Sequence, residues 1–517
     1  MTAAGRGGAA APATTVIGLD VGTTGVKAVA FGLGTPWRKV AMREYPLLRP
    51  AARQAVQDPA VILSAASAAL GECVASVGPS QVVGVSLSAA MHGLLALDAD
   101  RMPVSPLVTW ADGRAALEAT GMAADPRALD LQQTTGTPVH PMTPLCKLLW
   151  YRRNDPATWA AARWWVGLKD YLLLWLTGTL ATELSSASGT GLLDTFARAW
   201  SPLALTACSV DAEQLPPILA TTASLPMDRR VAASVGLPAG TPVIAGAADG
   251  PLANLGTGAI APGVAGLSLG TSGAIRVAVD RPLTDRHGRL FCYALAEPLW
   301  IVGGAISNGA EVLRWTEQAV GSDRAQRPGG PAARWPDGPV AESSDGLMML
   351  PFLLPERAPL WEPDLAGAYL GLRHHHGPGH LRRAAMEGVC LQMRFLLDRV
   401  DSGYPVTSVR ATGGAFGSPL WRDLMAAALD RPLTVVGDEE GTALGAAALG
   451  LLALGRAADL EEAVTVLGSA TTAGDPVPAR PEQVAAFAGM RQRLAVLLDG
   501  LTRTVAAEGP PNGPRGG

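Results

Sequence analysis

The 517-residue chain has few cysteines, little net charge and no obvious targeting segment. Its five cysteines (73, 146, 208, 292 and 390) form no CxxC pair, so they are expected to be buried free thiols in a reducing compartment. A net charge of −4 gives no indication of a nucleic-acid or acidic-membrane surface. The start, MTAAGRGGAAAPA, lacks the apolar segment of a secretory signal, and no apolar run approaches membrane-spanning length. A cytoplasmic protein without nucleic-acid or membrane partners is expected.

Length and composition favour two large globular domains. The chain is too long for one hydrophobic core, and 48% hydrophobic with 17% charged residues is typical of a globular protein. Residues 1–14 and 507–517 are rich in glycine and proline and are predicted to be disordered tails. A boundary near 256–263 divides an N-terminal domain, 15–256, from a C-terminal domain, 257–506.

Strands and helices alternate along the chain, which indicates an α/β fold. Apolar runs and helical periodicity place strands at 82–87, 241–247 and 406–414, and helices at 59–77, 113–123, 145–153, 169–176, 381–399 and 419–429. A Gly/Pro-rich insert at 321–339 is predicted to be a surface loop.

One short phrase occurs twice. VIGLDVGTTGVKAVA at 16–30 and AGLSLGTSGAIRVA at 265–278 align without gaps, so that Gly22-Thr23-Thr24 corresponds to Gly270-Thr271-Ser272. Each copy predicts a β-hairpin whose tip offers backbone N–H groups and hydroxyls. Either copy alone is equally well explained as an ordinary hairpin, but the pair favours two related domains that hold one polyphosphate from opposite sides.

Only the first copy carries an acid in its strand. Asp20 stands where the second copy has Ser268, and a single carboxylate beside a double phosphate clamp is what one Mg²⁺ ion needs. Lys27, on the outgoing strand, is expected near this site.

Asp249 follows the apolar run TPVIAGA and opens a predicted helix. As an isolated residue it is best explained as an N-cap. In a phosphate-binding protein it would instead orient and deprotonate an attacking hydroxyl, kept ionised by the helix N-terminus. A Gly-rich turn around Gly413 and Gly414, between a strand and a helix, would let a nucleotide lie against the backbone, although an ordinary glycine turn explains it too.

Two segments of the first half offer partners for a sugar chain. Met91-His92-Gly93 and the TWADGR segment, with Trp110, Asp112 and Arg114, are expected at strand ends. A tryptophan supplies an apolar face, and the charged residues supply hydroxyl and carboxylate partners. A core tryptophan beside a surface ion pair is the competing interpretation.

Histidines occur in two further settings. His140 lies between two prolines on the way to Lys147, which could hold a polar group in a cleft, although a lone histidine is more often structural. The HHH run at 374–376 and the nearby His380 resemble a metal cluster only superficially, because glycine and proline surround them and no organised carboxylates accompany them. A loop before a helix, with His380 near the helix start, is predicted.

Taken together, these motifs resemble the FGGY carbohydrate kinases of the actin/hexokinase/Hsp70-like superfamily. MTPLCKLLW at 142–150 is similar to the first family signature, and GAYLGL at 367–372 followed by HLRRAAME at 380–387 is similar to the second. Within the family, MHGLLALD at 91–98 and GTPVHPMTPL at 136–145 resemble gluconate kinases. Gly93 also fits xylulose kinases, and Gly113 stands where asparagine is common, so another sugar or polyol such as xylulose stays open.

The resemblance implies a duplicated α/β fold of two actin-like (ribonuclease H-like) ATPase domains with a cleft between them. It implies ATP-dependent phosphorylation of D-gluconate to 6-phospho-D-gluconate, with Asp249 as the base and Asp20 holding Mg²⁺. The nucleotide would meet both glycine turns, Lys27, Asn308, Gly413 and Gly414. The sugar acid would meet the Met91–Gly93 segment, Trp110, Asp112, Arg114, His140 and Lys147. A homodimer is compatible with the sequence. A non-catalytic nucleotide-binding regulator on the same scaffold is disfavoured by the presence of both acids.

Overall fold

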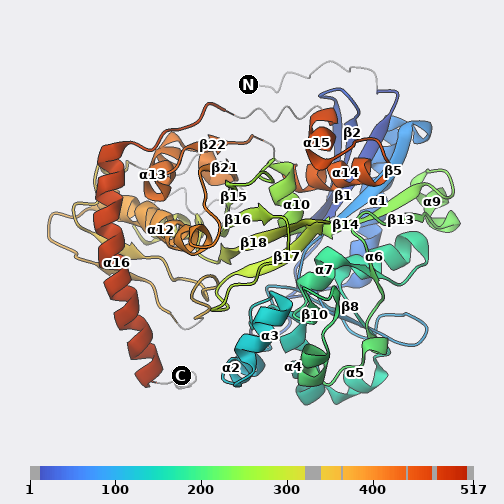
Figure 1. Ribbon diagram of the computed structural model, residues 1–517, viewed down its shortest axis with the longest axis horizontal. Helices are drawn as coiled ribbons and strands as arrows, with labels where there is room; N and C mark the ends of the chain where they lie inside the picture. Colours follow the sequence, from blue (N-terminus) through green and yellow to red (C-terminus); the bar gives the residue numbers. More distant parts are fainter. Residues whose placement is uncertain (1–11, 321–338, 363–364, 438–439, 468–473, 509–517) are drawn as a thin grey trace. The chain divides into compact units, whose positions relative to one another are not determined.

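The computed structural model describes residues 12–320, 339–362, 365–437, 440–467 and 474–508 (Figure 1). The chain divides into two compact units. The first comprises Met1–Gly258, Val279–Ile301 and Glu440–Thr471, and the second comprises Ala259–Ala278, Val302–Glu439 and Thr472–Gly517. The predicted tails fall mostly outside the described residues, as does nearly all of the predicted loop at 321–339.

The first unit is built on a six-stranded sheet with strand order β13-β14-β5-β1-β2-β3. Its strands are β1 (Thr15–Val21), β2 (Gly25–Gly32), β3 (Arg38–Glu44), β5 (Val82–Ala89), β13 (Ser224–Pro226) and β14 (Pro242–Ala248). β1, β5 and β14 are parallel neighbours, whereas β2 pairs antiparallel with both β1 and β3. The carboxyl ends of the three parallel strands therefore lie at one edge of the sheet.

Alternation along β1 assigns its two faces to different helices. Ile17, Leu19 and Val21 join the hydrophobic core that includes Ile62 and Leu70 of α1 (Pro59–Val77). The even-numbered residues face α14 (Gly441–Ala453), and a Cβ on Gly18 would lie 2.1 Å from the carbonyl oxygen of Ala443. In Figure 1 the orange-red α14 accordingly lies beside the blue β1, although the two are far apart in sequence.

Among the described residues, α1 is the one helix long and apolar enough to cross a membrane by length and composition alone. The expectation that no apolar run reaches that length is therefore wrong. Core helices of globular domains pass the same test, and α1 packs against β2, β3 and α9.

The first unit contains further helices and short strands outside this sheet. A second hydrophobic cluster, which includes Tyr151 and Trp165, binds several of its helices together. The helices are α2 (Ala116–Ala123), α3 (Ala128–Thr135), α4 (Pro144–Asn154), α5 (Pro156–Ala161), α6 (Leu168–Thr177), α7 (Leu184–Ser188), α8 (Pro202–Cys208), α9 (Arg229–Val235), α10 (Asp249–Gly256) and α15 (Leu460–Val466). The short strands are β4 (Val56–Gln57), β6 (Leu95–Leu97), β7 (Leu107–Val108), β8 (Trp164–Val166), β9 (Thr182–Glu183), β10 (Leu193–Asp194), β11 (Ala199–Trp200) and β12 (Ile218–Leu219).

A second six-stranded sheet repeats this plan, with strand order β17-β18-β16-β15-β21-β22. Its strands are β15 (Val264–Leu269), β16 (Gly273–Val279), β17 (Phe291–Ala296), β18 (Leu299–Ile306), β21 (Ser408–Thr412) and β22 (Leu433–Val435). The hairpin β15–β16 corresponds to β1–β2, and β21 and β22 lie parallel to β15 as β5 and β14 lie parallel to β1. The predicted duplication of an α/β fold is confirmed.

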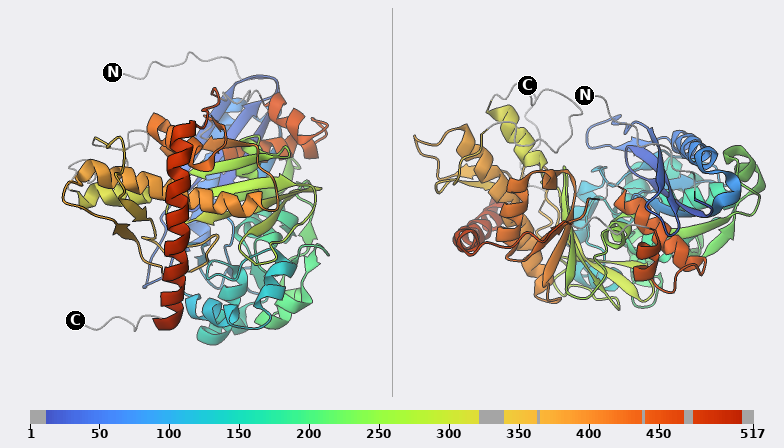
Figure 2. Two further views of the ribbon diagram at one scale, coloured as in Figure 1. Left: turned by 60° about the vertical axis from the view of Figure 1, so that its left-hand side comes forward. Right: turned by 90° about the horizontal axis from the view of Figure 1, so that it is seen from above.

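The helices of the second unit are α11 (Glu311–Ala319), α12 (Pro378–Asp401), α13 (Pro419–Leu429) and α16 (Pro481–Glu508), with a small sheet of β19 (Met348–Leu350) and β20 (Ala368–Leu370). The long α16 packs on α12 and α13, and Figure 2 (left) shows it crossing α12.

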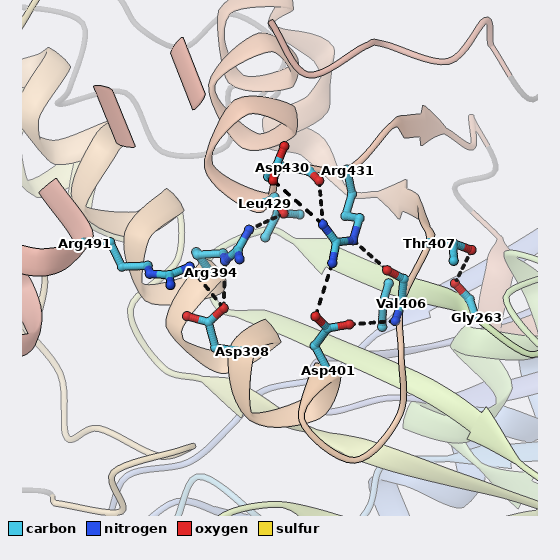
Figure 3. A network of polar contacts seen from close by, with 10 residues as sticks. All are labelled: Gly263, Arg394, Asp398, Asp401, Val406, Thr407, Leu429, Asp430, Arg431 and Arg491. Atoms are coloured by element: carbon cyan, nitrogen blue, oxygen red, sulfur yellow. Dashed lines mark hydrogen bonds and ion pairs between the residues drawn. The ribbon is translucent and has the colours of Figure 1, made fainter. Parts of the chain in front are cut away.

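Polar contacts fix the chain at the entry to β21 (Figure 3). Arg431 forms an ion pair with Asp401 at 3.1 Å and donates to the carbonyl oxygen of Val406 at 2.6 Å. The other carboxylate oxygen of Asp401 accepts from the Val406 N–H at 2.7 Å. This network ties the end of α12 to the segment that leads into β21.

Most predicted elements are confirmed. α1 and α13 have the predicted bounds, and α4, α6 and α12 differ from theirs by at most three residues at either end. β21 ends at Thr412 rather than at Gly414, because Gly413 has a φ of 113°, which a strand cannot accommodate. All five cysteines are free and buried, as expected.

Candidate active site

The first repeated phrase forms the predicted hairpin. Val21 pairs with Val26, and the Gly22 N–H donates to the Gly25 carbonyl oxygen at 2.9 Å. Neighbouring side chains hold the tip from outside: the Tyr45 hydroxyl donates to the Gly22 carbonyl oxygen at 2.6 Å, and Gln57 Nε2 donates to the Thr23 carbonyl oxygen at 2.5 Å. Thr24 is exposed at the tip. Neither Tyr45 nor Gln57 was anticipated, because each lies far from the hairpin in sequence.

Asp20, Ser88 and Asp249 meet at the carboxyl edge of the parallel strands. Asp20 and Ser88 are partners across β1 and β5, and Ser88 Oγ donates to Asp20 Oδ1 at 2.7 Å. Asp249 directly follows Ala248, which ends β14, the next strand along. The parallel order β14-β5-β1 thus brings together two carboxylates that are 229 positions apart, as counted from their residue numbers.

Burial dominates the electrostatics of Asp20. It raises the pKa of Asp20 from 3.8 to about 6, against the lowering effect of the Ser88 hydrogen bond. The negative charges of Asp249 and Glu440 raise this pKa further, and Lys27 lowers it. A buried carboxylate beside a second one is a site where a cation is strongly favoured.

Lys27 pairs with an acid from the far end of the chain. Its Nζ lies 3.2 Å from Glu440 Oε2 and 3.3 Å from Oε1. Glu440 immediately precedes α14, which packs on the Asp20 face of β1. The sequence gives no local signal for Glu440, because its role depends on the return of α14 to the first unit.

Asp249 is the first residue of α10, and Ala248 is the N-cap. Its Oδ1 accepts from the adjacent Gly250 N–H at 2.8 Å, so the plain N-cap interpretation does not describe this residue. Just before it, the Ala248 N–H donates to Ser185 Oγ at 3.1 Å, which fixes the end of β14 to α7.

Sequence reasoning missed a buried ion pair in the first unit. Lys169 Nζ and Glu183 Oε1 are 2.6 Å apart, and both side chains are almost wholly buried. The Glu183 carboxylate also accepts from the N–H groups of Ser185 and Ser186, at 2.5 and 2.8 Å, and so caps α7. Burial lowers the pKa of Lys169, while the charges of Glu183 and, more weakly, Asp249 raise it. The sequence feature that could have indicated this buried pair is the presence of Lys169 and Asp170 at the start of the otherwise apolar helix α6.

The Met91–Gly93 segment lines a small cavity after β5. The cavity has a volume of about 40 Å³, enough for ordered water, and Lys169 and Asp170 also line it. His92 has a left-handed backbone, φ 62°, and its Nδ1 lies 2.7 Å from the carbonyl oxygen of Gly189. Burial raises the pKa of Asp170 to about 6.

The TWADGR segment contains a tightly held ion pair. Arg114 donates twice to the buried Asp112 carboxylate, at 2.8 and 2.9 Å, and its guanidinium lies over the Trp150 ring. The Ala55 N–H also donates to Asp112, at 2.7 Å. Trp110 is 37% exposed, and its Nε1 donates to Thr23 Oγ1 at 2.8 Å. This segment therefore lies beside the first hairpin tip.

Lys147 is wholly buried and holds backbone together. Its ammonium donates to the carbonyl oxygens of His92 at 2.5 Å, Thr109 at 2.8 Å and Val108 at 3.4 Å. Burial lowers the pKa of Lys147 to about 7. His140 is half-buried, and its Nδ1 accepts from the Met142 N–H at 3.2 Å. Both residues thus fix the loops around the predicted sugar site.

In the second unit, the repeated hairpin packs on the segment that follows β18. The carbonyl oxygens of Gly270 and Thr271 accept from the N–H groups of Ala310 and Gly309, at 2.8 and 3.0 Å. A Cβ on Gly309 would lie 2.7 Å from the Gly270 carbonyl oxygen, so only glycine fits there.

Asn308, predicted to meet nucleotide, is wholly buried within this unit. Its Nδ2 donates to Glu356 at 2.7 Å and to the Leu354 carbonyl oxygen at 2.9 Å, and its Oδ1 accepts from the N–H groups of Leu353 and Leu354. Its amide therefore anchors the chain just before Gly309.

Gly413 and Gly414 lie at the same edge of the second sheet as the Gly270 turn. Thr412 pairs with Ser268 in the parallel ladder of β21 and β15. A Cβ on Gly413 would lie 2.3 Å from the Leu269 carbonyl oxygen, so glycine lets the two turns approach. The pair Ser268–Thr412 occupies the place that Asp20–Ser88 has in the first sheet.

The histidine run forms a loop, and His380 lies in the first turn of α12. Ligand atoms of Asp345, His375 and His376 lie within 4.8 Å of one another. However, Nδ1 of His376 and of His380 accepts a backbone N–H, which leaves the proton of each neutral ring on Nε2. Metal-binding histidines instead donate from the second nitrogen, so this geometry favours the loop interpretation.

Comparisons with known proteins give the family of this chain. The models for the N- and C-terminal domains of the FGGY family of carbohydrate kinases match residues 15–256 and 265–454. Gluconokinase from Bacillus subtilis is 34% identical over 88% of this chain and 90% of its own. Xylulose kinase from Escherichia coli is 32% identical over 84% and 90%. The structure of gluconate kinase from Lactobacillus acidophilus superposes with a TM-score of 0.86 at 29% identity, covering 96% and 98% of the chains.

The duplicated fold and these similarities define a carbohydrate kinase, with ATP as the phosphate donor that such kinases use. The chain belongs to the FGGY family of carbohydrate kinases.

Proposed function

We propose that this kinase transfers the γ-phosphoryl group of ATP to D-gluconate, giving 6-phospho-D-gluconate and ADP. The observation that carries the proposal is the position of Asp20, on β1, and of Asp249, directly after β14, at the carboxyl ends of the parallel strands β14-β5-β1 of the first unit. The similarity to the Bacillus subtilis gluconokinase, extending over most of both chains, supports the choice of acceptor.

In this proposal Asp249 is the base. It accepts the proton of the primary hydroxyl as that oxygen attacks the γ-phosphorus and ADP departs. Its place in the first turn of α10 favours the ionised carboxylate. Phosphoryl transfer depends on positioning more than on a strong base, so the fixation of Ala248 by Ser185 contributes directly to the alignment of Asp249.

The acidic edge fits Mg²⁺. Asp20 offers a hard carboxylate oxygen whose burial disfavours its charge unless a cation is near, and Asp249 adds a second negative charge. Asp20 would hold the ion, in part through water. When bound, Mg²⁺ would neutralise phosphate charge. Lys27 is held near the site by its ion pair with Glu440.

The two glycine turns would receive the phosphates. Gly22, Thr23 and Thr24 in the first unit and Gly270, Thr271 and Ser272 in the second offer amides and hydroxyls, as predicted for an anion site. Gly413 and Gly414 would face the nucleotide beside the second turn. Asn308 would act by positioning Gly309, which supports that turn.

The acceptor would contact the Met91–Gly93 segment, Trp110 and Arg114. Arg114 keeps its Nη1 edge for the gluconate carboxylate, because Nε and Nη2 bind Asp112. Lys147 would contribute indirectly, since its ammonium donates to three carbonyl oxygens of the surrounding loops. His140 would shape the neighbouring loop.

A xylulose kinase is the second candidate, because the Escherichia coli xylulose kinase is 32% identical to this chain. A coupled ADP-release assay over D-gluconate, D-xylulose and a panel of sugars and polyols distinguishes the two. The proposal predicts the highest kcat/KM for D-gluconate, and a strong preference for D-xylulose would overturn the choice of acceptor. A cytoplasmic location and a homodimer stay predictions.

A further inference from the structure

The indole of Trp110 contacts the phosphate-binding turn rather than standing apart from it. Its Nε1 lies 2.8 Å from Thr23 Oγ1. An indole N–H can only donate, so the threonine oxygen must be the acceptor in this bond. The single proton of the Thr23 hydroxyl is therefore directed away from the indole, where it can be donated to a phosphate oxygen.

The segment that carries Trp110 is tied to the same turn by a second route. The Thr109 hydroxyl donates to the Ala55 carbonyl oxygen at 2.8 Å, and the Ala55 N–H donates to Asp112 at 2.7 Å. Two residues on, Gln57 donates to the Thr23 carbonyl oxygen at 2.5 Å. The loop at 109–112 and the tip of the hairpin are thus both hydrogen-bonded to one short segment, at Ala55 and at Gln57 respectively.

Trp110 also presents a surface to solvent. Its side chain is 37% exposed, although its N–H is engaged. A carbon chain lying on the indole face restricts rotation of the ring and thereby the direction of its N–H. One side chain can therefore respond to the acceptor and act on the phosphate turn.

We propose that Trp110 is a positioning residue that orients the Thr23 hydroxyl and thereby couples binding of the acceptor to binding of the nucleotide phosphates. This proposal rests on the proposed function, since it requires that the acceptor lies on Trp110 and the phosphates on Thr23. Coupling between two ligands is reciprocal, so the acceptor tightens nucleotide binding by the same factor by which the nucleotide tightens acceptor binding. The tip of the second hairpin is held differently. There the carbonyl oxygen of Thr271 accepts from the backbone N–H of Gly309, whereas the carbonyl oxygen of Thr23 accepts from the side chain of Gln57.

The test is a double-mutant cycle measured by calorimetry on the full chain. Trp110→Phe keeps an aromatic face and removes the N–H, and Thr23→Val keeps the shape and removes the hydroxyl. The dissociation constant of ADP is determined with and without saturating D-gluconate for the wild type, both single variants and the double variant. Trp315→Phe is the matched control, because Trp315 is similarly exposed, at 42%, and lies on α11.

In the wild type, D-gluconate is expected to tighten ADP binding at least about fivefold, the lower end of typical coupling between sites. Trp110→Phe and Thr23→Val should each reduce this factor about fivefold, toward unity, and the double variant should lose no more than either single variant. Trp315→Phe should keep the wild-type factor. In steady state, Trp110→Phe should raise KM for ATP more than it lowers kcat.

The proposal is overturned if Trp110→Phe keeps the wild-type coupling factor, if the losses add in the double variant, or if the wild type shows no coupling. Thr23→Val removes the acceptor of the same hydrogen bond whose donor Trp110→Phe removes. The proposal can therefore still be tested with Thr23→Val if Trp110→Phe folds poorly. Failure of the proposed function is recognised separately, because the wild type would then give no turnover with D-gluconate.

Discussion

Ser88 Oγ donates to Asp20 Oδ1 at 2.7 Å, from the strand next to the one that carries the acid. This bond fixes the direction of a carboxylate that burial would otherwise favour in its protonated form. In the second sheet the equivalent pair is Ser268 and Thr412, without a carboxylate. The duplication has therefore kept the pairing of the strands, while one copy alone carries the acid.

Asp20 should reduce stability at neutral pH. In the folded state the pKa of Asp20 is about 6, above its ordinary value of 3.8. The stability that the protonated carboxyl contributes is therefore complete below pH 4, and it is lost as the pH rises through 6 and the buried group ionises. Asp20→Asn removes the buried charge and should raise the free energy of unfolding at pH 7.5, without Mg²⁺, by on the order of 1–3 kcal/mol. Urea unfolding across pH 4.5–8 measures this. The gain should shrink as the pH falls through 6 toward 4.5, and a gain that does not change with pH would contradict the assignment. The same variant should lose Mg²⁺-dependent turnover.

Asp249→Asn should abolish most turnover and leave nucleotide binding intact. Loss of a general base typically costs about 10²–10⁴-fold in rate. The amide keeps the shape of the carboxylate and can still accept from Gly250, so α10 should stay folded. Coupled ADP release gives kcat, and calorimetry gives the affinity for ATP. Near-normal kcat in this variant would reject Asp249 as the base.

Removing one member of the buried ion pair Lys169–Glu183 should lower the free energy of unfolding. Lys169→Met leaves the Glu183 carboxylate buried without its cation and should lower the free energy of unfolding by about 3–5 kcal/mol. Adding Glu183→Gln should recover part of the loss, because glutamine is neutral and its oxygen can still accept an N–H at the start of α7. Urea midpoints of the single and double variants compare the two. A double variant less stable than Lys169→Met would refute this account.

Packing of α14 on β1 should depend on Gly18. A Cβ at this position would overlap the Ala443 carbonyl oxygen at 2.1 Å, so Gly18→Ala should destabilise by about 1–3 kcal/mol or more. Gly441→Ala is the matched control, because a Cβ there meets nothing within 4 Å and alanine favours the helix. Thermal unfolding should show a lower Tm for the first variant and an equal or higher Tm for the second. Equal Tm values for wild type and Gly18→Ala would contradict the close approach.

Local sequence patterns were sufficient to predict the hairpins, the helices with clear caps, and the places of Asp20 on a strand and of Asp249 at a helix start. Each of these depends on residues within a few positions, such as the proline that begins α13 or the strand that precedes Asp249. Tyr45, Gln57 and Glu440 escaped prediction, because their partners lie far away in sequence and no short pattern marks them.

The charges of Lys147 and Arg114 have partners that the sequence does not indicate. Both residues were predicted to meet the sugar acid, but the Lys147 ammonium donates to backbone carbonyl oxygens, and the Arg114 guanidinium donates from Nε and Nη2 to Asp112. Sequence reasoning left out Lys169, although the charge of Asp249, the predicted base, contributes to raising the pKa of this lysine. Such differences follow from three-dimensional neighbours that the order of residues does not reveal.

The return of α14 to β1 and α10 also constrains how the protein is made. The first unit lacks the helix that covers one face of its sheet until residue 453 has left the ribosome, although the strands of that sheet are complete by residue 248. A nascent chain released early would expose the glycine-lined surface around Gly18 and Gly256, which α14 normally seals. Division of the chain at Gly258 would therefore leave the first unit without Val279–Ile301 and without α14, so a working split enzyme would need at least α14 grafted onto the N-terminal fragment.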